Sequence, residues 1–122
     1  MKFIEKYRSP NFDKRKKASF LNYIIIHYTA MRNHEEALSH LCEEQNKASS
    51  HFLISKTGEI FYLVDIDNRA WHAGKSFWKG INDINSESIG IEMDNSGHLY
   101  DFEKYSTKQI NSLLLLLKHI SK

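Results

Sequence analysis

The sequence predicts one α/β domain over residues 1–122, with a mixed central β-sheet flanked by helices. Segment 21–26 is rich in β-branched and aromatic residues, which is typical of strands, and segment 88–93 is expected to form another strand. Segments 51–54 and 60–64 flank a turn that contains a glycine, and this pattern predicts a β-hairpin. Helical patterns follow the first strand and the last strand. The order strand, helix, hairpin, loop, strand, helix therefore indicates an α/β fold with a mixed sheet.

The first strand is expected at 21–26, where three isoleucines end a segment without strict alternation. This pattern predicts a central strand that is buried on both faces. Asn33 followed by Glu36 is typical of a helix N-terminus, where the Asn side chain accepts a hydrogen bond from a free backbone N–H. One face of this helix carries four apolar residues, Ala37, Leu38, Leu41 and Cys42. We therefore interpret Cys42 as a core residue and not as a nucleophile or a metal ligand.

A long loop, a strand and a last helix complete the predicted fold. Residues 71–86 contain two glycines and several Asn and Asp residues, and long ordered loops in compact domains are usually functional. Residues 88–93 predict the strand that follows. Ser106 and Gln109 form a capping-box pattern at the start of the last helix. The expected apolar stripe of that helix consists of Ile110, Leu113, Leu114 and Leu117.

Composition excludes several classes of protein. Apolar residues make up 41% and charged residues 26%, as in an ordinary globular protein, which argues against disorder. The N-terminus lacks the apolar segment of a secretory signal, and the longest apolar run, 113–117, is too short to span a bilayer. Cys42 is the only cysteine, so no intramolecular disulfide can form, which fits a reducing compartment. We therefore expect a cytoplasmic protein without a membrane partner.

The one local excess of charge is the basic run at 14–17, Lys-Arg-Lys-Lys. A run of this kind can contact nucleic acid, although the formal net charge of the whole chain is only +2. No nucleic-acid recognition motif accompanies the run. A solvated lead-in to the first strand is the better interpretation, so no nucleic-acid partner is expected.

Two residues are candidates for chemistry because of their positions. His27 follows three isoleucines at the expected carboxyl end of a central strand, where ligands bind in open α/β sheets. An imidazole there needs a hydrogen bond or a metal. Glu92 interrupts an apolar strand, and burial would raise the pKa of its carboxyl toward the range of a general base. The alternative for His27 is a purely structural role, and the alternative for Glu92 is a side chain that points outward from a half-exposed strand.

The other histidines are less distinctive. His72 lies in the sequence Arg-Ala-Trp-His-Ala-Gly, which suits a sugar or peptide ligand, although a structural loop explains the pattern equally well. His51 is interpreted as buried and hydrogen-bonded, and His98 as part of a turn that could overhang a cleft. Three are expected to face solvent: His34, His40 and His119. Because HExxH, CxxC, GxSxG and phosphate-loop motifs are absent, the residues alone indicate only a histidine-plus-carboxylate hydrolase.

Five motifs nevertheless occur in a recognisable order, namely Ser9–Phe12, Ile24–Thr29, Ser50–Ile54, Arg69–Gly74 and Ser88–Glu92. Further matching positions are Gly58, Trp78, Gly80, Asn85, Asn95, Gly97, His98 and Gln109. With these motifs the chain resembles the amidase-2 family of N-acetylmuramoyl-L-alanine amidases, which is related to peptidoglycan recognition proteins and to short phage amidases. The resemblance covers nearly the whole chain.

The resemblance implies a reaction and a role for each matching residue. The reaction is zinc-assisted hydrolysis of the amide bond between N-acetylmuramic acid and L-alanine in peptidoglycan fragments. His27 matches the first ligand of a Zn²⁺ cofactor, and Glu92 matches the acidic residue that acts on the zinc-bound water. Trp71, His72 and Asn85 match positions in or near the substrate groove.

The sequence departs from the family pattern at its end. In the family, a second histidine, an aspartate or cysteine ligand and a lysine follow the last helix, and no residue here matches them. We therefore expect a C-terminally incomplete domain, as a fragment or a decayed gene product. A third possibility is a rewired site in which His51, His72 or His98 replaces a ligand. The alternative function is muropeptide binding without cleavage, and an uncovered sheet edge is expected to promote self-association.

Overall fold

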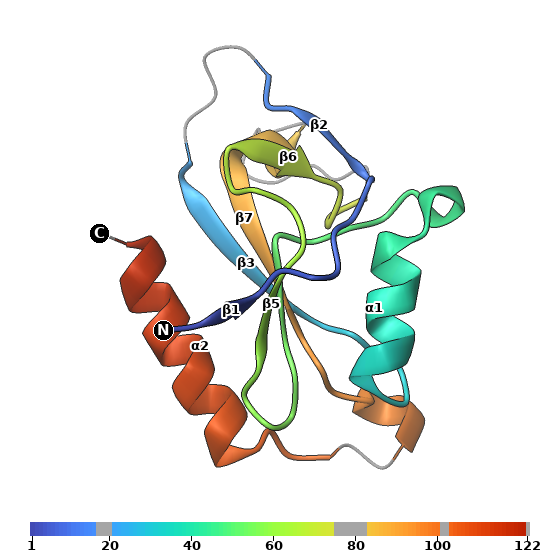
Figure 1. Cartoon of the computed structure of the whole chain (residues 1–122), viewed down its shortest axis with the longest axis vertical. Helices are drawn as coiled ribbons and strands as arrows, with labels where there is room; N and C mark the ends of the chain where they lie inside the picture. Colours follow the sequence, from blue (N-terminus) through green and yellow to red (C-terminus); the bar gives the residue numbers. More distant parts are fainter. Residues whose placement is uncertain (17–20, 75–82, 101–102, 122) are drawn as a thin grey trace.

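The computed structural model describes residues 1–16, 21–74, 83–100 and 103–121. In chain order its elements are β1 (Phe3–Ile4), β2 (Phe12–Lys14), β3 (Tyr23–Tyr28), α1 (His34–Cys42), η1 (Glu44–Asn46), β4 (Phe52–Ile54), β5 (Ile60–Tyr62), β6 (Asn68–Ala70), η2 (Ile84–Glu87), β7 (Ser88–Met93), η3 (Gly97–Tyr100) and α2 (Thr107–Ile120) (Figure 1). The elements labelled η are short 3-10 helices.

The main sheet has five strands in the order β1-β5-β4-β7-β3, and β2 and β6 form a separate two-stranded sheet. Strands β4 and β5 are antiparallel, as expected for the hairpin, whereas the other neighbours in the main sheet are parallel. The predicted mixed α/β sheet is therefore confirmed, together with the hairpin and the strand at 88–93. The short strands β1, β2 and β6 were not predicted, because two or three residues give no periodic signal.

The two α-helices cover opposite faces of the main sheet. Phe52 and Ile54 of β4 pack in one apolar cluster with Leu116 of α2, whereas Leu53 packs in a second cluster with α1. Successive side chains of a strand point to opposite faces, so the two clusters lie on opposite sides of the sheet. In Figure 1 the strands run between α2 at the left and α1 at the right.

The N-terminus of α1 is organised as predicted. Asn33 is the N-cap, and its Oδ1 accepts a hydrogen bond from the backbone N–H of Glu36 at 2.9 Å. This bond satisfies one of the free donors of the first helical turn. At the other end of the helix, Cys42 is partly buried against the apolar cluster beneath α1.

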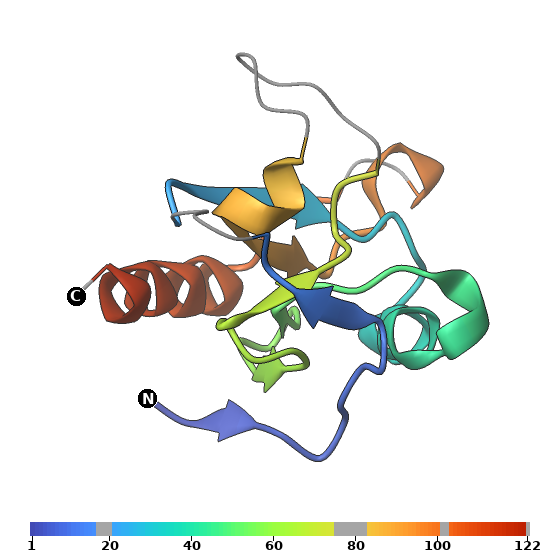
Figure 2. The ribbon, with the colours of Figure 1, turned by 90° about the horizontal axis from the view of Figure 1, so that it is seen from above.

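The prediction that the first strand is central and buried on both faces is wrong. Strand β3 is the last strand in the order and pairs with β7 alone among the described strands. Ile26 and Tyr28 are each 47% exposed as a result. In Figure 2 β3 lies at the margin of the sheet. A run of isoleucines reports the apolar character of a strand, but it does not report how many neighbours the strand has.

The apolar stripe predicted for α2 is partly wrong. The buried residues of this helix are Gln109 and Leu116, with Leu113, Leu117 and Ile120 partly buried beside them. Ile110 and Leu114 are 36% and 53% exposed. The buried face of α2 is rotated about the helix axis relative to the predicted stripe, because the Gln109 side chain faces the sheet. Its amide donates hydrogen bonds to the carbonyls of Ile54 and Asp94 at 3.0 and 2.9 Å. A polar side chain therefore holds the innermost position of the first turn.

The cap of α2 is half of the predicted capping box. Ser106 Oγ accepts a hydrogen bond from the Gln109 N–H at 3.1 Å, as expected, whereas the Gln109 side chain is directed to the sheet instead. Over the described residues, none of the helices is both long enough and apolar enough to cross a bilayer.

Candidate active site

His27 and Glu92 lie side by side on neighbouring strands. The parallel register of β3 and β7 pairs His27 with Glu92. On β7 the apolar cluster beneath α2 contains Ile89, Ile91 and Met93, so Glu92 belongs to the alternate set of side chains on the α1 face. The two candidates from the sequence therefore share the α1 face, near the carboxyl ends of both strands.

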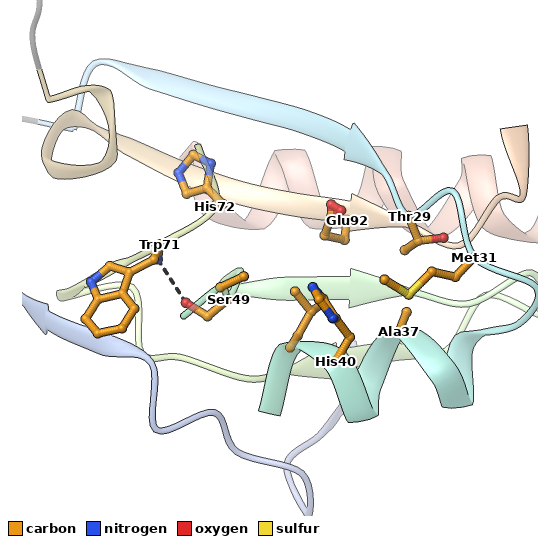
Figure 3. Close-up of a pocket in the computed structure, with 10 residues that line it drawn as sticks. Thr29, Met31, Ala37, His40, Ser49, Trp71, His72 and Glu92 are labelled. Atoms are coloured by element: carbon orange, nitrogen blue, oxygen red, sulfur yellow. Dashed lines mark hydrogen bonds between the residues drawn. The ribbon is translucent and has the colours of Figure 1, made fainter. Parts of the chain in front are cut away.

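Glu92 lines a pocket of about 180 Å³ between β7 and α1. Its wall also includes His72, Trp71, Ser49 and His40. Figure 3 shows Glu92 and Thr29 on one side of this pocket and His40 and Ala37, from α1, on the opposite side. The prediction that His40 faces solvent is wrong, because this side chain is partly buried in the pocket wall.

The electrostatics of Glu92 are those of a partly buried carboxyl that has no partner among the described residues. Burial raises its pKa to about 7, and within the described residues it has neither a hydrogen bond nor an ion pair. A carboxyl with this pKa is partly ionised at neutral pH, which is the state that a general acid or base requires.

His72 is the imidazole that the structure brings to His27. The Nε2 atom of His27 lies 3.0 Å from Nδ1 of His72, and the Nε2 atom of His72 lies 2.9 Å from Ser88 Oγ. Burial lowers the pKa of His27. The pKa of His72 is lowered to about 3, mainly by burial and secondly by the electrostatic effect of the nearby His27. Both rings are therefore neutral at physiological pH.

Asn85 holds the loop that carries His72. Its Oδ1 accepts from the Ala73 N–H at 3.0 Å, and its Nδ2 donates to the Ala73 carbonyl at 2.8 Å. Both groups of the amide are thus engaged by the backbone next to His72. Asn85 also lines a second pocket of about 320 Å³, together with Arg69 and Trp71. Trp71 lines both pockets, and its Nε1 is buried with no hydrogen-bond partner among the described residues.

His51 is fully buried, as the sequence indicated, and both its ring nitrogens are engaged. Its Nδ1 accepts from the Gly90 N–H at 3.0 Å, which leaves Nε2 as the N–H that donates to the Asn68 carbonyl at 2.8 Å. His98 lies at a different pocket, beside Tyr28 and Tyr105. Of the three histidines considered as replacement ligands, only His72 approaches His27.

Sequence reasoning missed Arg15, and it gave Gly90 only as part of a motif, without its contact with His72. The Arg15 guanidinium donates to the carbonyls of Ile66, Asn85, Ser86 and Ser88 at 2.7–3.2 Å. Arg15 is therefore not part of a solvated basic run, because it ties the segment before β7 to the β5–β6 connection; Lys17 lies outside the described residues. A Cβ on Gly90 would lie 2.3 Å from Cγ of His72, so only glycine leaves room for this ring.

The described residues do not complete a zinc site. Within ranges 1–16, 21–74, 83–100 and 103–121, no group of three His, Cys, Asp or Glu side chains is arranged to hold a metal ion. Catalytic zinc typically takes three protein ligands and one open position. His27 and His72 provide two side chains, one fewer than such a site needs.

The sequence model of the Amidase_2 family, described as N-acetylmuramoyl-L-alanine amidase, matches residues 16–122. The chain belongs to the Amidase_2 family. The family resemblance noted in the motifs is thereby confirmed.

Two of the individual relatives are named as amidases. The chain is 26% identical over 127 residues to the 1,6-anhydro-N-acetylmuramyl-L-alanine amidase AmpD of Haemophilus influenzae, covering 88% of this chain and 69% of that protein. It is 34% identical over 112 residues to the N-acetylmuramoyl-L-alanine amidase AmiD of Escherichia coli, covering 82% of this chain and 40% of AmiD. The chain thus spans less than half of AmiD.

Solved structures share the fold. A complex of E. coli AmiD with the substrate anhydro-N-acetylmuramic acid-L-Ala-D-γ-Glu-L-Lys superposes with a TM-score of 0.74 at 32% identity, over 88% of this chain and 46% of that one. AmpDh3 of Pseudomonas aeruginosa, in complex with an anhydromuramic pentapeptide, gives a TM-score of 0.68 at 32% identity, over 94% of this chain and 49% of that one. Both neighbours hold muropeptides.

Proposed function

We propose that this chain hydrolyses the amide bond between N-acetylmuramic acid and L-alanine in peptidoglycan fragments, with Glu92 as the general base. The observation that carries the proposal is the Glu92 carboxyl, which lines a pocket without a partner among the described residues and has a pKa raised to about 7 by burial. Membership of the Amidase_2 family and the muropeptides bound by two structural neighbours support the choice of substrate.

In this proposal Glu92 takes a proton from the water that attacks the amide carbonyl, and later returns it to the leaving amine. A carboxyl that is half ionised near neutral pH can serve both steps. Trp71, His72 and Asn85 contribute to substrate binding. Trp71 suits this role because its indole lies between two pockets, and Asn85 acts through the loop that it holds.

Members of the family depend on zinc in general, and we propose His27 as the ligand from β3. Further ligands would have to come from outside the described residues, since these do not supply a set of three.

The test is peptide release from anhydro-N-acetylmuramic acid-L-Ala-D-γ-Glu-L-Lys, measured with added zinc and again with a chelator. We expect zinc-dependent release of L-Ala-D-γ-Glu-L-Lys by the wild-type chain and its loss in Glu92→Gln. The matched control is Glu44→Gln, since Glu44 is an exposed glutamate at the start of η1. No release from folded wild-type protein would overturn the catalytic proposal.

The second candidate function is muropeptide binding without cleavage. The absence of a three-residue metal group among the described residues favours it. This function predicts that the muropeptide binds equally well with and without chelator and is recovered intact. Calorimetry followed by chromatography of the bound muropeptide distinguishes the two functions.

Self-association and a cytoplasmic location remain predictions. The first is supported by the open edge of β3, where Ile26 and Tyr28 are half exposed. Sedimentation analysis over a range of protein concentrations tests it, and a monomer at every concentration would contradict it. Fractionation of cells that express the native gene tests the location.

A further inference from the structure

A continuous chain of hydrogen bonds leads from β3 to η2. His27 Nε2 lies 3.0 Å from His72 Nδ1, His72 Nε2 lies 2.9 Å from Ser88 Oγ, and Ser88 Oγ lies 2.7 Å from the Ile84 carbonyl oxygen. Ser88 is fully buried, and His27 and His72 are partly buried. The order of donors and acceptors in this chain determines which nitrogen of His27 carries a proton.

The direction follows from the last member. A carbonyl oxygen can only accept, so the single hydroxyl proton of Ser88 points to Ile84. Ser88 Oγ must then accept from His72, which places a proton on His72 Nε2. In neutral His72 the other nitrogen, Nδ1, accepts, so the proton between the two rings belongs to His27 Nε2. Neutral His27 is left with an unprotonated Nδ1.

The alternative arrangement is a cationic His72 that donates from both nitrogens. Two features oppose it. His72 is packed against Gly90, where a Cβ would lie 2.3 Å from the ring, and no carboxylate among the described residues contacts the imidazole to balance a charge. The Arg15 guanidinium donates to the Ser88 carbonyl from the same region, so the local charge is already positive.

We infer that Ser88 is a positioning residue that acts through His72 to fix the tautomer of His27, so that Nδ1 of His27 is the nitrogen that keeps its lone pair. This inference rests on the proposed function, in which His27 presents a lone pair beside Glu92. Hydrogen bonds of this kind to the remote nitrogen of a functional histidine set both its tautomer and its ring orientation.

The arrangement assigns a reason to three features of the Ser88–Glu92 motif. Ser88 anchors the proton chain, Gly90 leaves space for the His72 ring, and Glu92 lies beside His27. These residues alternate along β7 and therefore share one face of the sheet. The motif thus carries the general base together with the support for the histidine on the next strand.

The first test is the tautomer itself, read from the ¹⁵N resonances of the histidine rings in the ¹⁵N-labelled wild-type chain at neutral pH. We expect protonated Nε2 and unprotonated Nδ1 in both His27 and His72. His51 is an internal control, because the Gly90 N–H and the Asn68 carbonyl fix the same tautomer independently of Ser88. A protonated Nδ1 on either His27 or His72 would overturn the inference without any variant.

The second test is Ser88→Ala, with Ser88→Thr as the variant that keeps the hydroxyl. In Ser88→Ala we expect His27 to populate both tautomers while the resonances of His51 stay unchanged, and in Ser88→Thr the wild-type tautomer returns. Peptide release should fall about 10–100-fold in Ser88→Ala, the usual effect of losing such a support, and recover in Ser88→Thr. An unchanged His27 tautomer in folded Ser88→Ala contradicts the inference.

These readouts separate this inference from the proposed function. If the wild-type chain releases no peptide, the amidase proposal fails, but the ring resonances still decide the role of Ser88. If the chain is active and His27 has the other tautomer, only the role of Ser88 is lost.

Discussion

The two faces of β7 differ in what they contribute, although they alternate along six residues of one strand. On the α2 face, Ile89, Ile91 and Met93 are at most 3% exposed and pack with Leu116. On the α1 face, Ser88 has a hydroxyl group and Glu92 a carboxyl group. Gly90, between them, leaves room for the His72 ring. The apolar α2 face packs against the core and stabilises the strand. The strand that is held in this way carries, on its α1 face, polar groups that are costly to bury. Substitutions on the two faces should therefore have opposite consequences.

The largest expected effect is that of Glu92→Gln on turnover. Removing a general base lowers the rate about 10²–10⁴-fold. The same change should raise the free energy of unfolding at pH 8 by about 2–3 kcal/mol, because the raised pKa means that burying the ionised form destabilises the native state. Peptide release and urea unfolding measure the two effects. Loss of both activity and stability would show that Glu92 is structural.

Ile91→Ala tests the opposite face of the strand. Ile91 is fully buried between β4 and β3, so a cavity there should lower the free energy of unfolding by about 2–5 kcal/mol. The turnover of the fraction that remains folded should change little, since the side chain points away from Glu92. Urea unfolding and an activity assay well below the melting temperature provide the measurements. A large loss of turnover in fully folded protein would contradict the separation of the faces.

Gly90→Ala should affect activity and stability together, because it introduces a methyl group where His72 lies. The new Cβ would be 2.3 Å from Cγ of His72, so the ring must move. Overpacking of this kind lowers stability by about 1–3 kcal/mol, and displacement of His72 should lower turnover as well. Gly74→Ala is the matched control, because no atom of the described residues lies within 4 Å of a Cβ at that position. Equal effects of the two substitutions would remove the special role of Gly90.

Local patterns were enough to predict much of the fold. The Asn33 cap, the hairpin around Gly58 and the strand at 88–93 depend on neighbours in sequence, and each was found. The exposure of β3 and the rotation of α2 were not found, because they depend on strand order and on the Gln109 amide contacting two distant carbonyls. Periodicity identifies an apolar face, but it does not identify what packs against that face.

The candidate site shows the same division. The sequence suggests His27 and Glu92 because each is a polar residue in or after an apolar strand, and the register of β3 and β7 pairs the two residues. Arg15 was hidden because its partners are backbone carbonyls more than fifty positions away, and these have no signature in sequence. Ser88 and Gly90 belong to a motif of the sequence, but the roles proposed for them depend on the His72 ring, which comes from another segment of the chain.

The smallest expected effect is the response of wild-type stability to mild acid. His51 and His72 have pKa values lowered to about 4 and about 3, so the unfolded chain binds protons first as the pH falls below about 6.5 and stability is lost. Glu92 acts in the opposite direction: its pKa is raised, so the destabilisation caused by its charge is relieved as the pH falls from about 7 toward 4.5. The two contributions therefore oppose each other.

Between pH 7 and pH 5 the two histidines together should remove about 3–4 kcal/mol, and Glu92 should restore about 2 kcal/mol of that loss. Glu92→Gln eliminates the restoring contribution, so over the same interval its stability should fall by about 2 kcal/mol more than that of the wild-type chain. Urea unfolding of both proteins at the two pH values measures the difference. Equal losses in the two proteins would mean that Glu92 titrates as an exposed glutamate does, and the α1 face of β7 would then hold no poised carboxyl.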